Sequence, residues 1–259
     1  MVLAFACSVV ATRSARADIL QETWEETYPV SATVTLHVRN GDGRIYIYGS
    51  EENEMKVTAV KRAFTKARLD VIAIRVALTG DTATGGDIAT IETIIPPLSP
   101  GGGLTQDRSG TVEYTIIVPQ NCSVAQSDLA KGEILIEGMR GASVNATLGR
   151  GRLLARNCFS PTKLSVSEGG MDIFFTWWEE QPFSLQGEIS DGDLRVGLPE
   201  EASLRLEAGS SRGRVLNLFA EEGAENGEAQ ELRTTFGSGG PGEMTLRAGT
   251  GNIRIEKAF

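Results

Sequence analysis

A glycine-marked repeat dominates residues 124–217 and limits what the chain can fold into. Each unit contains a run of alternating apolar and polar residues, a glycine turn and a second alternating run. The marker glycine precedes each second run, and successive markers are 19, 19, 22 and 21 residues apart: Gly132, Gly151, Gly170, Gly192 and Gly213. Similar units surround Gly251 and occupy residues 36–47. A fixed period of this length predicts stacked structural repeats.

The alternation has a period of two, which is typical of β-strands with one buried face. Glycine adopts the positive φ that a tight corner between two strands requires. One unit alone cannot bury enough apolar surface to offset the entropy lost in ordering it, so the units must stack. We therefore predict an all-β fold, a parallel β-solenoid in which each rung consists of a strand, a glycine corner and a second strand.

Residues beside each marker glycine should lie above one another in successive rungs. This register places Glu133 beside Arg152 and Asp193 beside Arg214, as a solvated charge ladder that fixes strand alignment. Asp191 and Asp193 also share one face of a strand, as a catalytic carboxylate pair would. Because no further acidic residue at a suitable spacing accompanies Asp191 and Asp193, we favour the charge ladder over a catalytic pair.

The N-terminus has features of a secretory signal peptide. An apolar run at residues 2–11 precedes Ala15-Arg16-Ala17, a small-x-small sequence typical of a cleavage site. We therefore assign residues 1–17 to a signal peptide and expect an exported protein, located in the periplasm, at the cell surface or outside the cell.

The remaining chain, residues 18–259, is predicted to form a single β-solenoid domain. Residues 18–120 would be a β-rich but irregular N-terminal cap region, and residues 121–259 the regular rungs. An acidic, glycine-rich insertion at 221–242 occupies the place of one rung. The last strand has no obvious cap, so either the N-terminal region folds over it or the C-terminal rung associates edge to edge with another copy of the chain.

Composition argues against several partners and bonds: nucleic acid, a membrane span, a disulfide and a bound metal. The net charge of −9 argues against nucleic acid as a partner, because phosphates require a basic face. The mature chain has no segment that predicts a transmembrane span. Cys122 and Cys158 would lie about two rungs apart, too far for a disulfide, so we expect free, partly buried thiols. His37 is the only histidine, and neither a metal site nor a cofactor is predicted.

An unusual aromatic run follows one rung. In residues 171–178, alternation would direct Phe175 and Trp177 inward and Phe174 and Trp178 outward. Exposed aromatic rings beside two glutamates could stack on a sugar ring or a protein partner. The alternative is a packed rung corner. Phe174, Trp177 and Trp178 are the candidate binding residues of this sequence.

Four segments carry a resemblance to a known family. They are residues 112–119, Gly132-Glu133-Ile134, Gly151-Arg152-Leu153 and residues 192–199, and residues 40–47 are similar to the family's N-terminal segment. Over about residues 33–256, the chain resembles the bacterial family of exported "putative adhesins", proteins of unknown function with β-strand repeats. The resemblance implies a β-solenoid outside the cytoplasm and supplies no catalytic residues.

The leading functional hypothesis is a non-enzymatic envelope or surface protein, an adhesin-like scaffold that presents side chains to a polysaccharide or an envelope protein. A polysaccharide-acting enzyme is the first alternative, because parallel β-helices also carry lyases and hydrolases. It would require acidic or basic residues converging in one groove. A sensing or regulatory partner of an envelope stress system is the second alternative.

Overall fold

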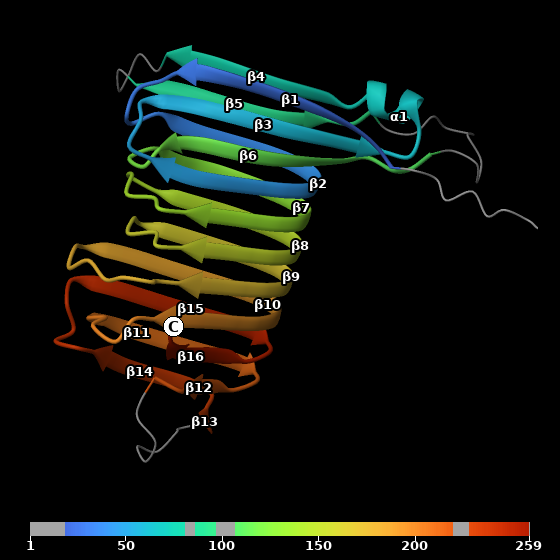
Figure 1. Ribbon diagram of the computed structural model, residues 1–259. Helices are drawn as coiled ribbons and strands as arrows, with labels where there is room; N and C mark the ends of the chain where they lie inside the picture. The colour runs from blue at the N-terminus through green and yellow to red at the C-terminus, as the bar shows by residue number, and fades with distance from the viewer. Residues whose placement is uncertain (1–18, 81–85, 97–106, 220–227, 259) are drawn as a thin grey trace, which may run out of the picture.

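The computed structural model describes residues 19–80, 86–96, 107–219 and 228–258. The protein is all-β, as predicted, and the sixteen strands in these ranges join in one open sheet (Figure 1). In the described ranges the only helix is α1 (Lys66–Asp70), where Thr65 caps the N-terminus by accepting a hydrogen bond from the Arg68 amide. The signal peptide predicted at residues 1–17 lies outside the described residues.

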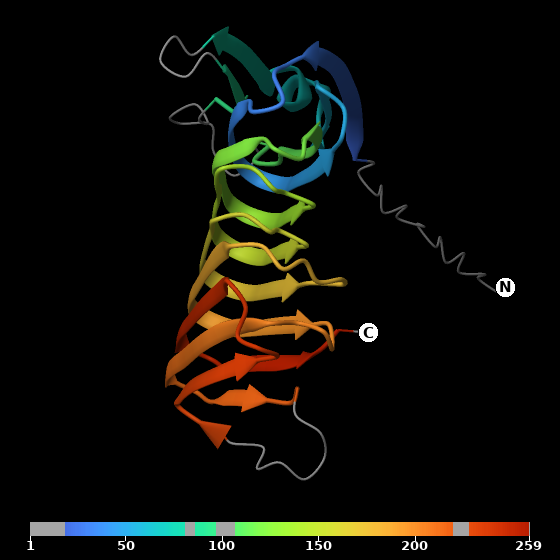
Figure 2. The same ribbon diagram turned by 90° about the vertical axis from the view of Figure 1, so that its left-hand side faces the viewer.

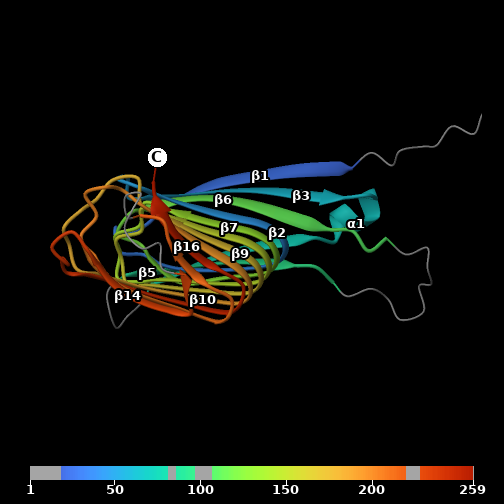
Figure 3. The same ribbon diagram turned by 90° about the horizontal axis from the view of Figure 1, so that it is seen from below.

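Long strands stacked in parallel form the middle of the molecule. They are β2 (Thr35–Ser50), β7 (Ser123–Glu137), β8 (Val144–Arg156), β9 (Thr162–Phe174) and β10 (Phe183–Leu198). Each pairs in parallel with the next. Each bends at a glycine, and seen along the stack the bends lie on the same side (Figure 3). We call the part before the glycine the first arm and the part after it the second arm.

The bends coincide with a column of glycines, which we call the corner glycines. Gly43, Gly132, Gly151, Gly169 and Gly192 lie in register, with φ between 128° and 137°. A Cβ on Gly151 would lie 1.8 Å from the carbonyl oxygen of Gly132, so no other residue fits. The marker glycine predicted for the third rung, Gly170, is wrong by one residue. Gly169 occupies the corner, and Gly170 follows it in more open space.

The N-terminal region, which was predicted to be β-rich and irregular, makes the sheet mixed rather than wholly parallel. The strands here are β1 (Leu20–Pro29), β3 (Glu54–Ala63), β4 (Ala73–Gly80), β5 (Asp87–Ile94) and β6 (Thr111–Pro119). The pairs β1–β3, β3–β6 and β4–β5 are antiparallel, whereas β5 and β6 join β2 in parallel. These strands form the upper end of an elongated body (Figure 2).

The C-terminal strands do not follow chain order. They are β11 (Leu204–Arg212), β12 (Val215–Asn217), β13 (Glu228–Ala229), β14 (Glu231–Phe236), β15 (Gly242–Thr250) and β16 (Ile253–Lys257). β15 lies between β10 and β11, and β16 lies between β10 and β12. In the insertion predicted at 221–242, β14 pairs antiparallel with β11.

Two sequence predictions are corrected by this order. The C-terminal rung has strands on both sides, so it offers no free edge for self-association. Asp193 does not meet Arg214, because Asn252 lies between them. The Asn252 amide donates to Asp193 Oδ1 at 2.8 Å, and Asn252 Oδ1 accepts from the Arg214 amide at 3.1 Å. The predicted pairing of Glu133 with Arg152 is confirmed in register.

The core is a set of apolar columns between the arms. One column follows the register through Ile45, Ile134, Leu153, Met171, Leu194 and Ile253, all fully buried. Cys122 and Cys158 are free thiols, as expected, but they are completely rather than partly buried. Each column therefore buries one apolar side chain per rung, which is the stacking that the alternation predicted.

Candidate functional site

Three hollows meet along the outer face of the first arms and form one furrow. The hollow nearest the C-terminal strands is about 790 Å³. It shares Ser165 and Glu188 with a hollow of about 370 Å³, which shares Thr147 with a third of about 420 Å³. The furrow therefore runs across the strands, parallel to the long axis of the molecule.

One row of register-matched residues follows the furrow. In order of strand pairing it is Glu92, Arg39, Asp128, Thr147, Ser165, Glu188, Arg247, Gly209 and Glu231. We call these residues the furrow row. They come from nine strands, so the row is about 38 Å long at about 4.8 Å for each step between strands.

The repeat itself creates the row. The seven members from Arg39 to Gly209 each lie four residues before a glycine at a bend, such as Thr147 before Gly151 and Arg247 before Gly251. Because side chains alternate along a strand, this constant offset puts them all on the outer face. The sequence carries this signal in the constant offset of four residues before the glycine, whereas the residues beside the glycines do not reveal it.

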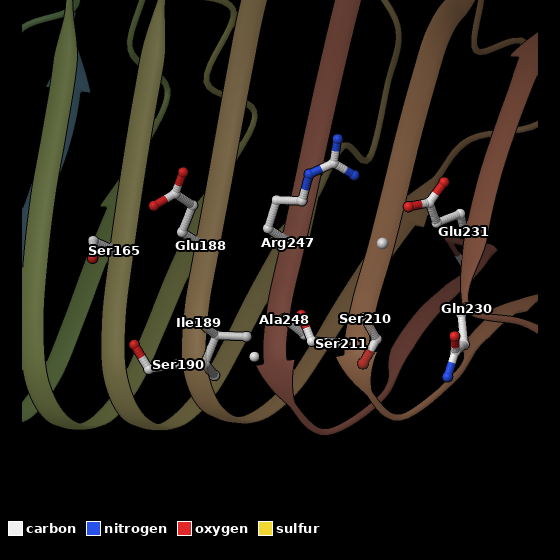
Figure 4. A pocket seen from close by; sticks show the side chains of 12 residues that line it. Ser165, Glu188, Ile189, Ser190, Ser210, Ser211, Gln230, Glu231, Arg247 and Ala248 are labelled. Carbon is white, nitrogen blue, oxygen red and sulfur yellow. The ribbon is translucent and has the colours of Figure 1, made fainter.

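Small residues make the furrow hollow. Thr147 and Ser165 have short side chains, and Gly209 has none. The Arg247 guanidinium lies across Gly209, where an added Cβ would be 2.8 Å from Arg247 Nη1. Arg247 Nη2 reaches to 3.8 Å from Glu207 Oε2 on β11. Arg247 is thereby turned away from Glu188, its neighbour in the row (Figure 4).

Charge is distributed unevenly along the furrow. At its N-terminal end, Arg39 and Asp128 both hydrogen-bond Gln126, and Glu92 lies 3.8 Å from Arg75. At the other end, Glu188 and Glu231 are exposed and have no ion pair among the described residues. This end presents two exposed carboxylates beside serine hydroxyls, with Arg247 between them in the row. The carboxylate and hydroxyl oxygens can accept hydrogen bonds from a polar ligand.

The spacing of these carboxylates does not suit glycoside hydrolysis. Three strand steps separate Glu188 from Glu231. At about 4.8 Å a step they are about 14 Å apart, beyond the roughly 5–9.5 Å between the carboxyl groups of glycosidases. Glu188 and Glu231 therefore do not form a glycosidase pair, and the residues that line the three hollows include no aromatic side chain.

The aromatic residues chosen from the sequence lie elsewhere, and their predicted orientations were partly wrong. Because β9 ends at Phe174, the alternation stops there. Phe175 is buried as predicted, but Trp177 is 43% exposed and Trp178 turns inward. Trp178 packs with Phe159, Phe175 and Phe183 at ring-centroid distances of 5.6–6.1 Å.

The structure separates the three candidate residues. Phe174 is half-buried under Arg195, whose guanidinium carbon lies 4.8 Å from the ring centroid. Trp177 Nε1 donates to Glu179 Oε1 at 3.0 Å, and Glu179 also forms an ion pair with Arg140. Of these three residues, only Trp177 therefore presents a large exposed aromatic surface, and the three rings do not form one flat patch.

Groups with shifted pKa values lie outside the furrow. Burial raises the pKa of Cys122 and Cys158 to about 12, and burial also raises the pKa of Tyr114 to about 12. Hydrogen bonds from Ser109 and Thr65 lower the pKa of Asp107 to about 2. No group of His, Cys, Asp and Glu in the described ranges could hold a metal ion. Within the same ranges, no helix has the length and apolar character to cross a membrane.

The fold has a counterpart among solved structures. The crystal structure of a "putative cell adhesion protein" from Clostridium sporogenes aligns with a TM-score of 0.55 and 18% identity, covering 92% of this chain and 100% of that chain. That agreement shows a shared fold. A "putative adhesin" from Bacteroides fragilis aligns with a TM-score of 0.31 and 11% identity, over 90% of this chain and 97% of that chain. A TM-score this low does not establish a common fold. No family model and no curated protein matches the sequence.

Proposed function

We propose that this chain is an exported, non-enzymatic surface protein of adhesin type, which binds a linear polysaccharide lengthwise in the furrow. The observation that carries the proposal is the furrow row, a continuous line of register-matched residues, mainly small or charged, across nine strands. Its length suits a chain-like ligand better than a single sugar. Its hydroxyl and carboxylate groups suit the hydroxyls of a glycan.

The stacked strands support a binding role because they hold the row rigidly. Each row member from Arg39 to Arg247 projects from a hydrogen-bonded strand whose opposite face is buried in an apolar column. Side chains on rigid strands lose little entropy when a ligand binds. The description of the Clostridium sporogenes protein as a "putative cell adhesion protein" is consistent with the proposal.

The finer architecture belongs to the same proposal. We treat residues 18–259 as one domain, in which the parallel strands β7–β10 are successive turns of a β-solenoid. Export requires the signal peptide at residues 1–17. Mass spectrometry of the chain recovered from the periplasm or medium of an expressing bacterium should give a mature N-terminus at Asp18. An intact Met1 in the exported protein would exclude cleavage.

A second candidate surface is the region around Trp177, because this indole is exposed beside Glu179 and Glu180. It would stack on one sugar ring or on a protein side chain. Unlike the furrow, it offers a single contact, so we rank it below the furrow.

The furrow proposal is tested by blocking its centre. Ser165→Trp fills the furrow from an exposed position and leaves the core unchanged. Binding to size-fractionated cell-envelope polysaccharide and to cello- and chitin-oligosaccharides would be measured by isothermal titration calorimetry. We expect Ser165→Trp to abolish binding. Thr115→Trp, on the exposed outer side of β6 and outside the three hollows, is the matched control.

Two results would contradict the proposal. One is equal binding by the parent and by folded Ser165→Trp. The other is loss of binding on Trp177→Ala with no effect of Ser165→Trp, which would transfer the site to the aromatic region. Circular dichroism and urea unfolding would establish that each variant is folded.

A further inference from the structure

A separate hollow of about 360 Å³ lies on the outer face of the second arms. It is formed where β9, β10, β16 and β12 lie side by side. Because the first and second arms are separated by the corner glycines, this hollow is not part of the furrow. Its volume falls within the range of small-molecule binding sites and suits a single sugar unit.

Two arginines lie next to each other in this hollow. Arg195 and Arg254 are paired in register on β10 and β16. Like charges directly opposite each other on neighbouring strands destabilise a sheet, so this pair is unfavourable unless something compensates it. Among the described residues, carboxylates form ion pairs with Arg195 but not with Arg254.

Arg195 is fully engaged by neighbouring groups. Its Nε donates to Asp172 Oδ1 at 3.1 Å, and its Nη1 lies 3.5 Å from Glu256 Oε1. Asp172 is 8% exposed and also accepts from Arg152 Nε at 2.6 Å, so its charge is satisfied from both sides. Neither Asp172 nor Glu256 therefore has a charge left over for Arg254.

Arg254 is exposed at the mouth of the hollow and has no ion pair or hydrogen bond with any described residue. A free guanidinium presents a planar fork of donors, which matches the two oxygens of a carboxylate. The hollow thus contains one strong, unused site for an anion.

The other groups in the hollow suit the body of a sugar. Asn252 uses its Oδ1 and its backbone amide within the protein, so its Nδ2 remains as a donor. Asp193 accepts the Asn252 amide through Oδ1, and Oδ2 remains as an acceptor for a hydroxyl. Leu216 provides an apolar side wall, and an added Cβ on Gly170 would meet nothing within 4 Å.

We infer that this hollow binds an acidic sugar of the uronic acid class, with its carboxylate on Arg254 and its hydroxyls toward Asn252 and Asp193. A monoanion fits better than a phosphate dianion, because the carboxylate of Asp193 also lines the hollow and would repel the second charge. The inference rests on a different face and different residues from the furrow.

The test uses glucuronate as the probe, with glucose and inorganic phosphate as comparisons. Binding would be followed by two-dimensional NMR titration of the isotope-labelled chain. We expect glucuronate to shift the amide signals of residues 252–255 and 193–195 in a saturable way. Glucose should bind about tenfold more weakly or worse, because it lacks the charge-assisted pair.

Two variants define the site. Arg254→Gln removes the charge, and Gly170→Leu fills the hollow at a position where an added Cβ has free space. Both should weaken glucuronate binding about tenfold or more. Arg205→Gln is the matched control, because Arg205 is an exposed strand arginine paired with Glu243, and its strands β11 and β15 do not line the hollow.

Specific outcomes would overturn the inference. They are saturation by phosphate as tight as by glucuronate, which would mean a general anion site, or unchanged glucuronate binding in folded Arg254→Gln and Gly170→Leu. Absence of any glucuronate shift would also overturn it. Ser165→Trp should leave glucuronate binding intact, so failure of the furrow proposal and failure of this inference are distinguishable.

Discussion

At each bend, the carbonyl oxygen of one corner glycine occupies the space that a side chain on the next would need. A Cβ on Gly132, Gly151, Gly169 or Gly192 would lie 1.8–1.9 Å from that oxygen. All four also have φ between 131° and 137°, where side chains are strained. The glycine is therefore required twice, for its backbone conformation and for the close approach of the strands.

This double requirement predicts a large cost for one methyl group. Gly151→Ala should lower the free energy of unfolding by roughly 3 kcal/mol or more, because backbone of two rungs must move apart. Urea denaturation followed by circular dichroism measures the change. Gly170→Ala is the control, since its Cβ meets no atom within 4 Å, and it should change stability by less than about 1 kcal/mol. Equal costs at the two positions would contradict this explanation of the bends.

The buried cysteines give the protein a specific response to alkaline pH. Burial raises the pKa of Cys122 and Cys158 from 9.0 to about 12. Above pH 9 the unfolded chain loses thiol protons that the native chain keeps. Stability therefore falls as the pH rises from 9 toward about 12, where the native thiols also ionise.

Replacing both thiols isolates their contribution. Cys122→Ala/Cys158→Ala should show a shallower decline in unfolding free energy from about pH 9 to pH 11 than the parent, although tyrosines such as Tyr114 still contribute in both proteins. Urea titrations at several pH values provide the slopes. Identical slopes would show that the thiols do not contribute.

At the scale of strands, sequence periodicity predicted the parallel stack well and its ends poorly. The alternation in residues 124–198 became β7–β10 because every rung repeats the same pattern and register. The order of the last strands was not predictable from spacing. Strand β15 continues the register of β10 as well as that of β11, so the repeat alone cannot decide which strand lies next to which.

The aromatic run shows the same limit at a strand end. Alternation gives side-chain directions only while the strand continues, and β9 stops at Phe174. Beyond Phe174, packing against other residues determines the side-chain directions. Trp178 rather than Trp177 packs with the rings of Phe159, Phe175 and Phe183. Its inward direction reflects tertiary contacts that no local pattern contains.

The position of β15 predicts its hydrogen exchange. Because β15 is paired on both sides, successive amides from Met244 to Ala248 should all be protected to a similar degree. In β1, which among the described strands pairs only with β3, protected and rapidly exchanging amides should alternate. NMR-detected exchange measures both. Alternating protection in β15 would mean that one of its two neighbours is wrongly placed.

For the molecule as a whole, the fold class followed from the sequence, but the furrow did not. Each row member is an ordinary polar residue in its own strand, and only stacking turns Thr147, Ser165 and Glu188 into parts of one surface. The offset of four residues before the glycine was visible, yet the order of the row depended on how the strands stack, because β15 lies between β10 and β11.

The central claim is that this furrow binds a linear glycan along its length. The most direct measurement is the affinity of the parent chain for a ladder of size-fractionated cello- and chitin-oligosaccharides, by isothermal titration calorimetry. Affinity should rise with oligosaccharide length and level off once the ligand spans the row, about 38 Å. Binding that is equally strong for a disaccharide and for the longest chain, or absent for every length, would contradict the claim.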